Sequence, residues 1–328
     1  MALSDLAVFT EYTYAATVQV VAQQVALFNE AAQGTFILRA ANHAGDFSDT
    51  AFWQRLNGLV RRRNAYGSGN IPVINMSMLT DSMVKIAAGT PVVQMDPGQF
   101  AWINASPEEA GALMGQQLAQ DMIRDMFNVA VSALIASHVQ VASLVKDQTA
   151  VGDGKMSMAN FNVAQAVYGD RWQNIRAWVM HSAPMFGLFG NALTNNERLY
   201  DFGTLNVRND PFGRPFIVSD APALYVPPGA DPVANPANYY TLGVTPGAVL
   251  VDQNDDFIDN WDTSNGKENI ARTYQAEWSY NLGVKGFSWD KTNGGKSPTD
   301  AALVSAGSWD RVAGYNDRDL GAVLIKTK

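Results

Sequence analysis

The chain is organised around one long stretch, residues 106–139, SPEEAGALMGQQLAQDMIRDMFNVAVSALIASHV. Ser106 is a good N-cap, Pro107 fits the first helical position and Glu109 stands three residues after the cap, which is the pattern of a capping box. No proline follows, and apolar residues recur as a broad band on one helical face, namely Leu113, Met114, Leu118, Met122, Met126, Ala130 and Leu134. At 1.5 Å per residue this helix spans roughly 50 Å. We therefore expect a spine helix across which other elements lie.

A second helix is predicted before the spine, from about Glu11 to Gln33. Gly34 stands where a left-handed C-cap belongs, and apolar residues recur at spacings of four and three, namely Tyr14, Val18, Val21, Val25, Phe28 and Ala32. Two interpretations stay open. The helix packs on its own domain, as amphipathic helices usually do, or it forms an arm that lies on a neighbouring subunit.

The clearest strand pattern runs from Tyr274 to Val284, where apolar and polar residues alternate. Such alternation predicts a long strand with one buried face, and its aromatic residues suit a sheet face packed against a long helix. The remaining pattern mixes helices and strands without a regular β-α-β succession, so the fold class is α+β. Helices are expected over 157–168 and 182–193 and from 297, with strands over 177–180, 215–218, 248–251 and 322–325.

Residues 35–100 lack the long periodic patterns of the rest of the chain. Short apolar runs alternate with residues typical of loops, and the stretch includes Arg61-Arg62-Arg63. So many residues without a strong element of their own are unusual in a compact monomer. We therefore expect a projecting β-loop whose partners lie elsewhere, with the three arginines in ion pairs between subunits.

Composition excludes several classes of protein. Only 16% of the 328 residues are charged, against roughly a quarter in an ordinary soluble domain, which suggests that a large oligomer covers much of the surface. The net charge of −8 argues against a nucleic-acid-binding surface. The absence of cysteine rules out disulfides and thiolate chemistry. There is no secretory signal pattern, and the most apolar helical window, 126–136, is about half the ~20 residues that a membrane crossing needs.

Candidate chemical residues do not form a coherent site. His43 is interpreted as a solvated loop residue and His138 as a partly positive residue that suits the end of the spine helix. His181 precedes Ser182, but adjacency in sequence does not make a triad. Residues 252–256, DQNDD, begin like a calcium loop, yet Phe257 stands where glycine is required, so an acidic surface turn is predicted. We predict no catalytic residue, cofactor or metal site, and therefore no enzyme.

Several segments carry a family resemblance. Residues 179–182, VMHS, and 212–220, FGRPFIVSD, resemble the axial-domain segments of tailed-bacteriophage major capsid proteins. Residues 268–287 are similar to their long peripheral-domain strand, and residues 297–303 with Trp309-Asp310 resemble the C-terminal end of one subgroup. The resemblance implies the HK97-like fold. Its parts would be an N-terminal arm (1–34), an extended loop region (35–100), a peripheral domain with the spine helix (101–150), an axial domain (151–265) and a return to the peripheral domain with the C-terminal segment (266–328).

The function that this resemblance implies is assembly. Hexamers and pentamers would tile an icosahedral head that encloses double-stranded DNA, with the extended loop over the adjacent subunit and no sequence-specific DNA binding. The expected location is the virion, after late expression and assembly in the host cytoplasm, without a membrane. A mildly negative lumen would repel the packaged duplex.

The implied partners are a separate scaffolding protein, a portal protein and decoration proteins. No long, charged, coiled-coil-like segment precedes the arm, so scaffolding is expected from another chain. The chain starts at Met1, from which no proteolytic maturation is expected. Lys85 is the only lysine between residues 35 and 100, which gives no support to a Lys–Asn crosslink.

Three alternatives stay open. The nearest is an encapsulin-type shell protein on the same fold, which the contents of the shell would distinguish. Another is a different virion structural protein, such as a tail tube or decoration protein. The third is a hydrolase with an unrecognised site, which a histidine and a carboxylate in a closed pocket would support.

Overall fold

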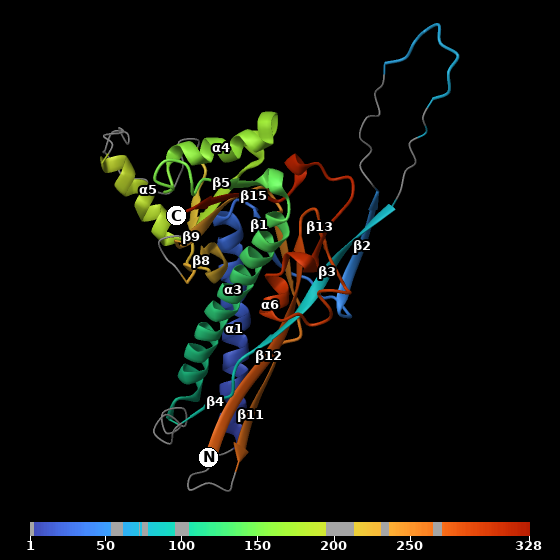
Figure 1. Ribbon diagram of the computed structural model, residues 1–328. Coiled ribbons are helices and arrows are strands. Elements are labelled where there is room, and N and C mark those ends of the chain that lie inside the picture. Colours follow the sequence, from blue (N-terminus) through green and yellow to red (C-terminus); the bar gives the residue numbers. More distant parts are fainter. Residues whose placement is uncertain are drawn as a thin grey trace.

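The computed structural model describes residues 3–53, 62–71, 73, 78–95, 105–194, 213–230, 236–264 and 271–328. Within these residues, two long helices lie beside a nine-stranded sheet, and a six-stranded sheet with its own helices caps one end of the pair (Figure 1). A two-stranded hairpin projects away from the body on the opposite side from the helices α4 (Met158–Tyr168) and α5 (Ser182–Thr194). None of the helices described here has a stretch long and apolar enough to cross a membrane.

The spine helix, α3, runs from Pro107 to Val139 as predicted. Ser106 is its N-cap residue, but the Ser106 side chain makes no capping hydrogen bond, so the predicted capping box is not formed. The apolar band is buried from Leu118 onward, whereas Leu113 is 47% exposed. Leu113 points away because the neighbouring helix approaches on the side of Gly111 and Gly115, roughly half a turn round the helix.

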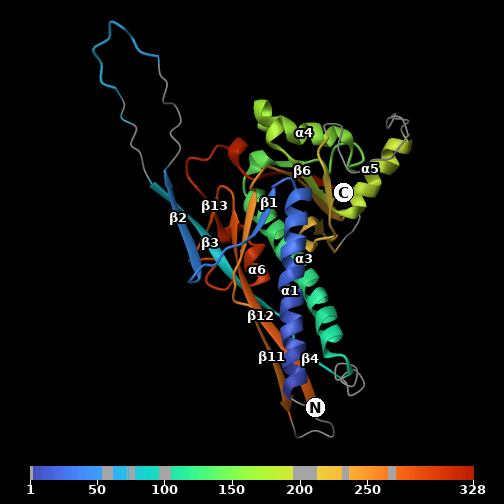
Figure 2. The same cartoon turned by 180° about the vertical axis from the view of Figure 1, so that it is seen from behind.

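The first helix, α1 (Leu3–Ala31), begins earlier than predicted and lies along α3 in the same direction (Figure 2). A Cβ atom on Gly115 would lie only 2.6 Å from the carbonyl oxygen of Thr13 and 2.8 Å from Cβ of Ala16, so glycine is what permits this close approach. Thr17 Oγ1 donates a hydrogen bond of 3.3 Å to the carbonyl of Gly115. The helix therefore packs on its own chain. It ends at Ala31, and both Gln33 (φ 50) and Gly34 (φ 68) are left-handed, so the left-handed cap begins one residue before the predicted Gly34.

The larger sheet is built on β12 (Ala271–Val284), which pairs antiparallel with β3, β4, β10, β11 and β13. β1 pairs parallel with β10, whereas β2 pairs antiparallel with β3 and β14 pairs antiparallel with β13. The bounds are β1 Phe36–Ala40, β2 Phe47–Trp53, β3 Met78–Gly89, β4 Val93–Gln94, β10 Val249–Gln253, β11 Ile258–Ser264, β13 Phe287–Trp289 and β14 Trp309–Arg311.

The predicted one-sided burial of β12 holds only for its first half. Gln275 and Glu277 are exposed, but Ser279 and Asn281 are buried. Asn254 explains the difference, because it binds both residues: its Nδ2 donates to Ser279 Oγ at 2.8 Å, and its Oδ1 accepts from Asn281 Nδ2 at 3.0 Å. A polar network therefore covers the face that alternation assigns to solvent.

The smaller sheet has the order β5-β15-β9-β6-β7, with β8 paired to β9. Its core includes Trp178 and Phe161, whose rings lie 4.6 Å apart at a steep angle. The strands are β5 Val145–Asp147, β6 Ala177–Met180, β7 Phe216–Val218, β8 Tyr225–Val226, β9 Asn238–Val244 and β15 Ala322–Thr327.

Short helices occupy the connections between these elements. α6 (Asp300–Leu303) is capped by Thr299, whose side chain accepts a hydrogen bond from Ala302 N, so the cap lies two residues later than the predicted Ser297. The 3-10 helices are η1 Ala142–Leu144, η2 Gly169–Asn174, η3 Pro222–Leu224, η4 Ala306–Ser308 and η5 Asp317–Asp319.

Residues 35–100 contribute both to the body and to the projection. All four strands of this stretch belong to the large sheet. β3 pairs with β12 from Val84 to Gly89, and its outer part pairs with β2 from Phe47↔Val84 to Trp53↔Met78. Residues 62–71 lie far beyond the paired strands (Figure 1), and together with Val73 they are called the far end of the hairpin. The predicted projecting loop is thus a hairpin that the large sheet supports at its base.

Candidate assembly surface

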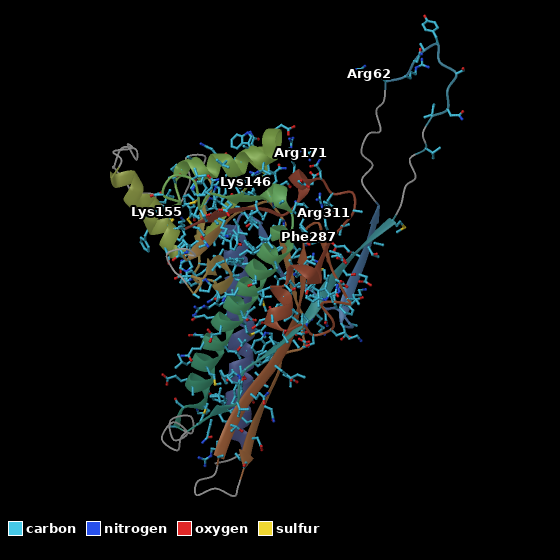
Figure 3. The ribbon with its side chains drawn as sticks, viewed as in Figure 1. Arg62, Lys146, Lys155, Arg171, Phe287 and Arg311 are labelled. Atoms are coloured by element: carbon cyan, nitrogen blue, oxygen red, sulfur yellow. The ribbon has the colours of Figure 1, made fainter. Side chains whose placement is uncertain are left out.

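The far end of the hairpin is a mixed basic and apolar surface. Arg62 and Arg63 are exposed there, and Figure 3 labels Arg62 well away from the body. Tyr66 is 98% and Val73 84% exposed. No carboxylate among the described residues forms an ion pair with either arginine. Exposed apolar side chains beside unpaired cations are typical of an interaction surface. Arg61 lies outside the described residues.

The base of the hairpin is fastened to the loop that follows β13. Lys291 Nζ lies 2.8 Å from Oδ1 and 2.6 Å from Oδ2 of Asp49, and Ser82 Oγ donates to Asp49 Oδ1 at 2.6 Å. Lys296 pairs with Asp46 at 2.9 Å. The hydrogen bonds from Lys291 and Ser82 lower the pKa of Asp49. Two lysines of one loop therefore hold two aspartates of the hairpin base.

Another ion pair joins β1 to β10. Asp252 on β10 is completely buried, and Arg39 on β1 contacts both of its oxygens, with Nε at 2.6 Å and Nη2 at 3.1 Å. His43 Nε2 lies 3.2 Å from Asp252 Oδ2. The prediction of an acidic surface turn at 252–256 is therefore wrong for Asp252. His43 lies in a loop, as predicted, with 33% of its side chain exposed and its Nε2 against Asp252. The parallel pairing of β1 with β10 places Arg39 directly opposite Asp252, which no local pattern could indicate.

The cluster of Ser48, His43 and Asp252 contains the three residue types that a hydrolase with a catalytic triad would require. Ser48 Oγ lies 3.4 Å from His43 Nδ1, so Ser48, His43 and Asp252 follow one another in the order of a catalytic triad. However, the Arg39 guanidinium already compensates the Asp252 carboxylate, and the serine–histidine contact is long for a hydrogen bond. The geometry fits a strut between β1, β10 and the start of β2 rather than a nucleophile.

His138 is a structural residue of the core. Its Nε2 accepts a hydrogen bond of 2.9 Å from the backbone N–H of Ala322, so Nδ1 carries the proton and donates to the carbonyl of Leu134 at 2.8 Å. Burial lowers the pKa of His138 to about 4, and its ring packs on Phe287, which is labelled in Figure 3. The prediction of a partly positive capping residue is wrong, because the imidazole is neutral and joins α3 to β15.

His181 lies at the surface of the smaller sheet. Its Nε2 is 3.5 Å from Asp220, and its ring lies 5.2 Å from that of Tyr239 and 6.2 Å from that of Tyr225. Ser182 Oγ is 3.5 Å from His181 Nδ1, while the Ser182 N–H donates to Asp220. This arrangement caps the start of α5. Over the part of the chain that the structure describes, no group of three or more histidines and carboxylates is placed to hold a metal ion.

Comparison with known proteins identifies the family. A family model described as Gp13-like, major capsid protein 13-like, matches residues 5–323. The chain belongs to this family of major capsid proteins. Among curated proteins, no sequence matches it.

Solved structures share the fold of this capsid protein at low sequence identity. The structure entitled "Microbacterium phage Oxtober96" matches with a TM-score of 0.54 and 12% identity, over 90% of each chain. The capsid of Ralstonia phage GP4 matches with a TM-score of 0.50 and 11% identity, over 89% of this chain and 87% of the other. The cyanophage Pam1 capsid asymmetric unit matches with a TM-score of 0.50 and 10% identity, over 87% and 85%. The predicted HK97-like α+β fold is confirmed.

Family membership also confirms the predicted function as a major capsid protein. It implies assembly into capsomers of a phage head, a place in the virion and a structural rather than catalytic role. The comparisons give no support to an encapsulin-type shell, a different virion protein or a hydrolase.

Proposed function

We propose that this capsid protein forms the hexameric and pentameric capsomers of an icosahedral tailed-phage head, with the hairpin of each subunit lying over an adjacent subunit. The observation that supports this proposal is the far end of the hairpin. Arg62, labelled in Figure 3, lies well away from the body, and neither it nor the exposed Arg63 has an ion-pair partner among the described residues. Tyr66, Ile71 and Val73 are exposed in the same segment. A second copy of the chain would supply the missing carboxylates and cover the apolar side chains.

The remaining parts have the roles that the family fold suggests. The five segments are proposed to act as an N-terminal arm (1–34), extended loop region (35–100), peripheral domain (101–150), axial domain (151–265) and returning peripheral and C-terminal segment (266–328). The axial domain would surround the symmetry axis of each capsomer. In this arrangement α1, which packs on α3, would keep its exposed face, including Tyr12 and Val18, for a neighbour.

Other components of the head are part of the same proposal. A separate scaffolding protein would guide assembly in the host cytoplasm, a portal protein would occupy one vertex, and decoration proteins would bind the finished surface. Double-stranded DNA would be enclosed without sequence-specific contacts, because the net charge of −8 opposes tight binding to phosphates. Tight binding of duplex DNA by purified shells at physiological salt would contradict this last point.

Charge reversal at the far end of the hairpin tests the central claim. The double variant Arg62→Glu, Arg63→Glu should keep the circular dichroism spectrum and Tm of the parent subunit, because both side chains are exposed. We expect it to lose closed shells in sedimentation and negative-stain microscopy, since like charges would face the neighbour. The double variant Arg62→Lys, Arg63→Lys, which keeps both positive charges at the same exposed positions, is the matched control and should form closed shells. Normal shells from the double variant would overturn the proposed role of the arginines.

A further inference from the structure

A cavity of about 470 Å³ lies where the two sheets meet. Four connections wall it: the end of η2 at Asn174, the β9–β10 turn at Thr245 and Pro246, the β12–β13 turn at Lys285, and residues 313–315 and 318–320 between β14 and β15. Because one chain supplies all these walls, the cavity exists in the single subunit. It is large enough for a small ligand.

Two reciprocal ion pairs lie beside this cavity, and one residue of each pair, Arg318 or Asp319, lines it. Arg318 Nη1 pairs with Asp170 Oδ1 at 2.9 Å, and Arg171 pairs with Asp319. Each pair joins η2 to η5, and Arg171 is labelled in Figure 3. The carboxylate of Asp319 lines the cavity, but the guanidinium of Arg171 compensates its charge.

Lys285 also lines the cavity, but it belongs to neither of these ion pairs. Its Nζ donates a hydrogen bond of 3.1 Å to the carbonyl of Pro246, which also lines the cavity. Among the described residues, no carboxylate lies within 4.0 Å of this ammonium group. Burial lowers the pKa of Lys285, whereas Asp319 raises it by a smaller amount. The net charge of this cluster is therefore +1, because it contains three cations (Arg171, Arg318 and Lys285) and two carboxylates (Asp170 and Asp319).

An ammonium group has three N–H donors, and a partly buried charge is costly unless it is paired. One neutral carbonyl satisfies only one of the donors of Lys285 and none of its charge. We propose that the cavity binds a small oxyanion, of the phosphate or carboxylate class, through the Lys285 ammonium group, with the Arg318 guanidinium as a second source of positive charge. The bound anion bridges the β12–β13 turn and the β14–β15 connection, and thereby stabilises the junction of the two sheets.

Binding can be measured on the unassembled full-length subunit, so its failure would leave the proposed capsomer assembly untouched. Phosphate, acetate and chloride are titrated at matched ionic strength, and Tm is followed by scanning fluorimetry. A ligand that binds only the folded state stabilises it in proportion to the logarithm of one plus the ratio of ligand concentration to Kd. We therefore expect Tm to rise by about 2–4 °C when phosphate or acetate is present at roughly ten times the Kd. A phosphate response alone identifies a phosphate site, and a response to acetate as well identifies a general oxyanion site.

Variants test the role of Lys285. Lys285→Met should abolish the rise in Tm, whereas Lys155→Met, which removes an exposed lysine, should keep it. Broadening of the ³¹P signal of phosphate by the parent protein, reversed by sulfate, tests binding without relying on the folding of any variant. Equal responses to chloride, or a phosphate response that survives in Lys285→Met, would overturn the proposal. Absence of both the Tm rise and the ³¹P broadening in the parent protein would do the same.

Discussion

Lys291 contacts both carboxylate oxygens of Asp49, at 2.8 and 2.6 Å, and so ties the base of the β2–β3 hairpin to the loop after β13. Ser82 adds a third hydrogen bond to the same carboxylate, and its own N–H donates to Ser288 Oγ at 3.0 Å. Side chains at the base of the hairpin therefore fix the direction in which it leaves the body. The two arginines at its far end have no ion-pair partner among the described residues. Lys291 also lies 5.1 Å from the centre of the Phe47 ring.

Removing this anchor should loosen the hairpin without unfolding the subunit. In Lys291→Met we expect a loss of less than about 1 kcal/mol, because both partners are more than 40% exposed and exposed pairs contribute little. Hydrogen exchange should become faster over residues 47–53, while β12 stays protected. Lys326→Met, which disrupts a longer surface pair with Asp147 at 3.9 Å, is the control. Unchanged exchange in β2 would show that the sheet alone orients the hairpin.

The contact between α1 and α3 should not tolerate a methyl group at Gly115. Gly115→Ala would place Cβ 2.6 Å from the carbonyl oxygen of Thr13, so the helices must separate. We expect a net loss of about 1–2 kcal/mol in urea unfolding, because the cost of overpacking exceeds the gain in helix propensity. Gly69→Ala, where no atom lies within 4 Å, should change stability by less than about 0.5 kcal/mol. Equal stability of the two variants would contradict the close helix contact.

His138 should make the subunit less stable in mild acid. Its pKa is lowered to about 4 in the folded chain, against about 6.5 when unfolded. The neutral imidazole therefore contributes its full stability above pH 6.5, and this contribution falls as pH drops from 6.5 to 4, by about 3 kcal/mol. His138→Gln, which retains an acceptor but cannot titrate, should flatten this part of the stability curve. An identical pH profile in the two proteins would exclude His138 as the cause.

Asp81, in the outer part of β3 opposite Thr50, should change stability with pH in the opposite sense. Burial raises the pKa of Asp81 to about 6, so the folded state holds a proton that the unfolded chain releases near pH 4. Stability is therefore lost as pH rises from 4 to 6, and Asp81→Asn should restore about 1–2 kcal/mol at pH 7.5, after allowance for partial exposure. The variant and parent should converge below pH 4. A destabilised variant at pH 7.5 would show that the charge of Asp81 is needed.

Local patterns predicted the two elements that carry the fold. Alternation located β12, and uninterrupted helix formers with Pro107 located α3 to the residue, because periodicity and capping depend on neighbours in the chain. The strand β6 was likewise predicted with its observed bounds. The low charge content and the run Arg61-Arg62-Arg63 led to the prediction of a surface that other subunits cover, although they did not indicate which contacts would form.

Tertiary structure alone decided the state of the polar residues. Asp252 reads as part of an acidic turn, yet a parallel strand more than 200 residues away in sequence brings Arg39 against it and buries it. His138 reads as a charged cap, yet the N–H of Ala322 requires an acceptor and makes the ring neutral. The β2–β3 hairpin has weak patterns because β12 supports its base. Periodicity shows which residues share a face, but burial and charge depend on what the distant chain places against that face.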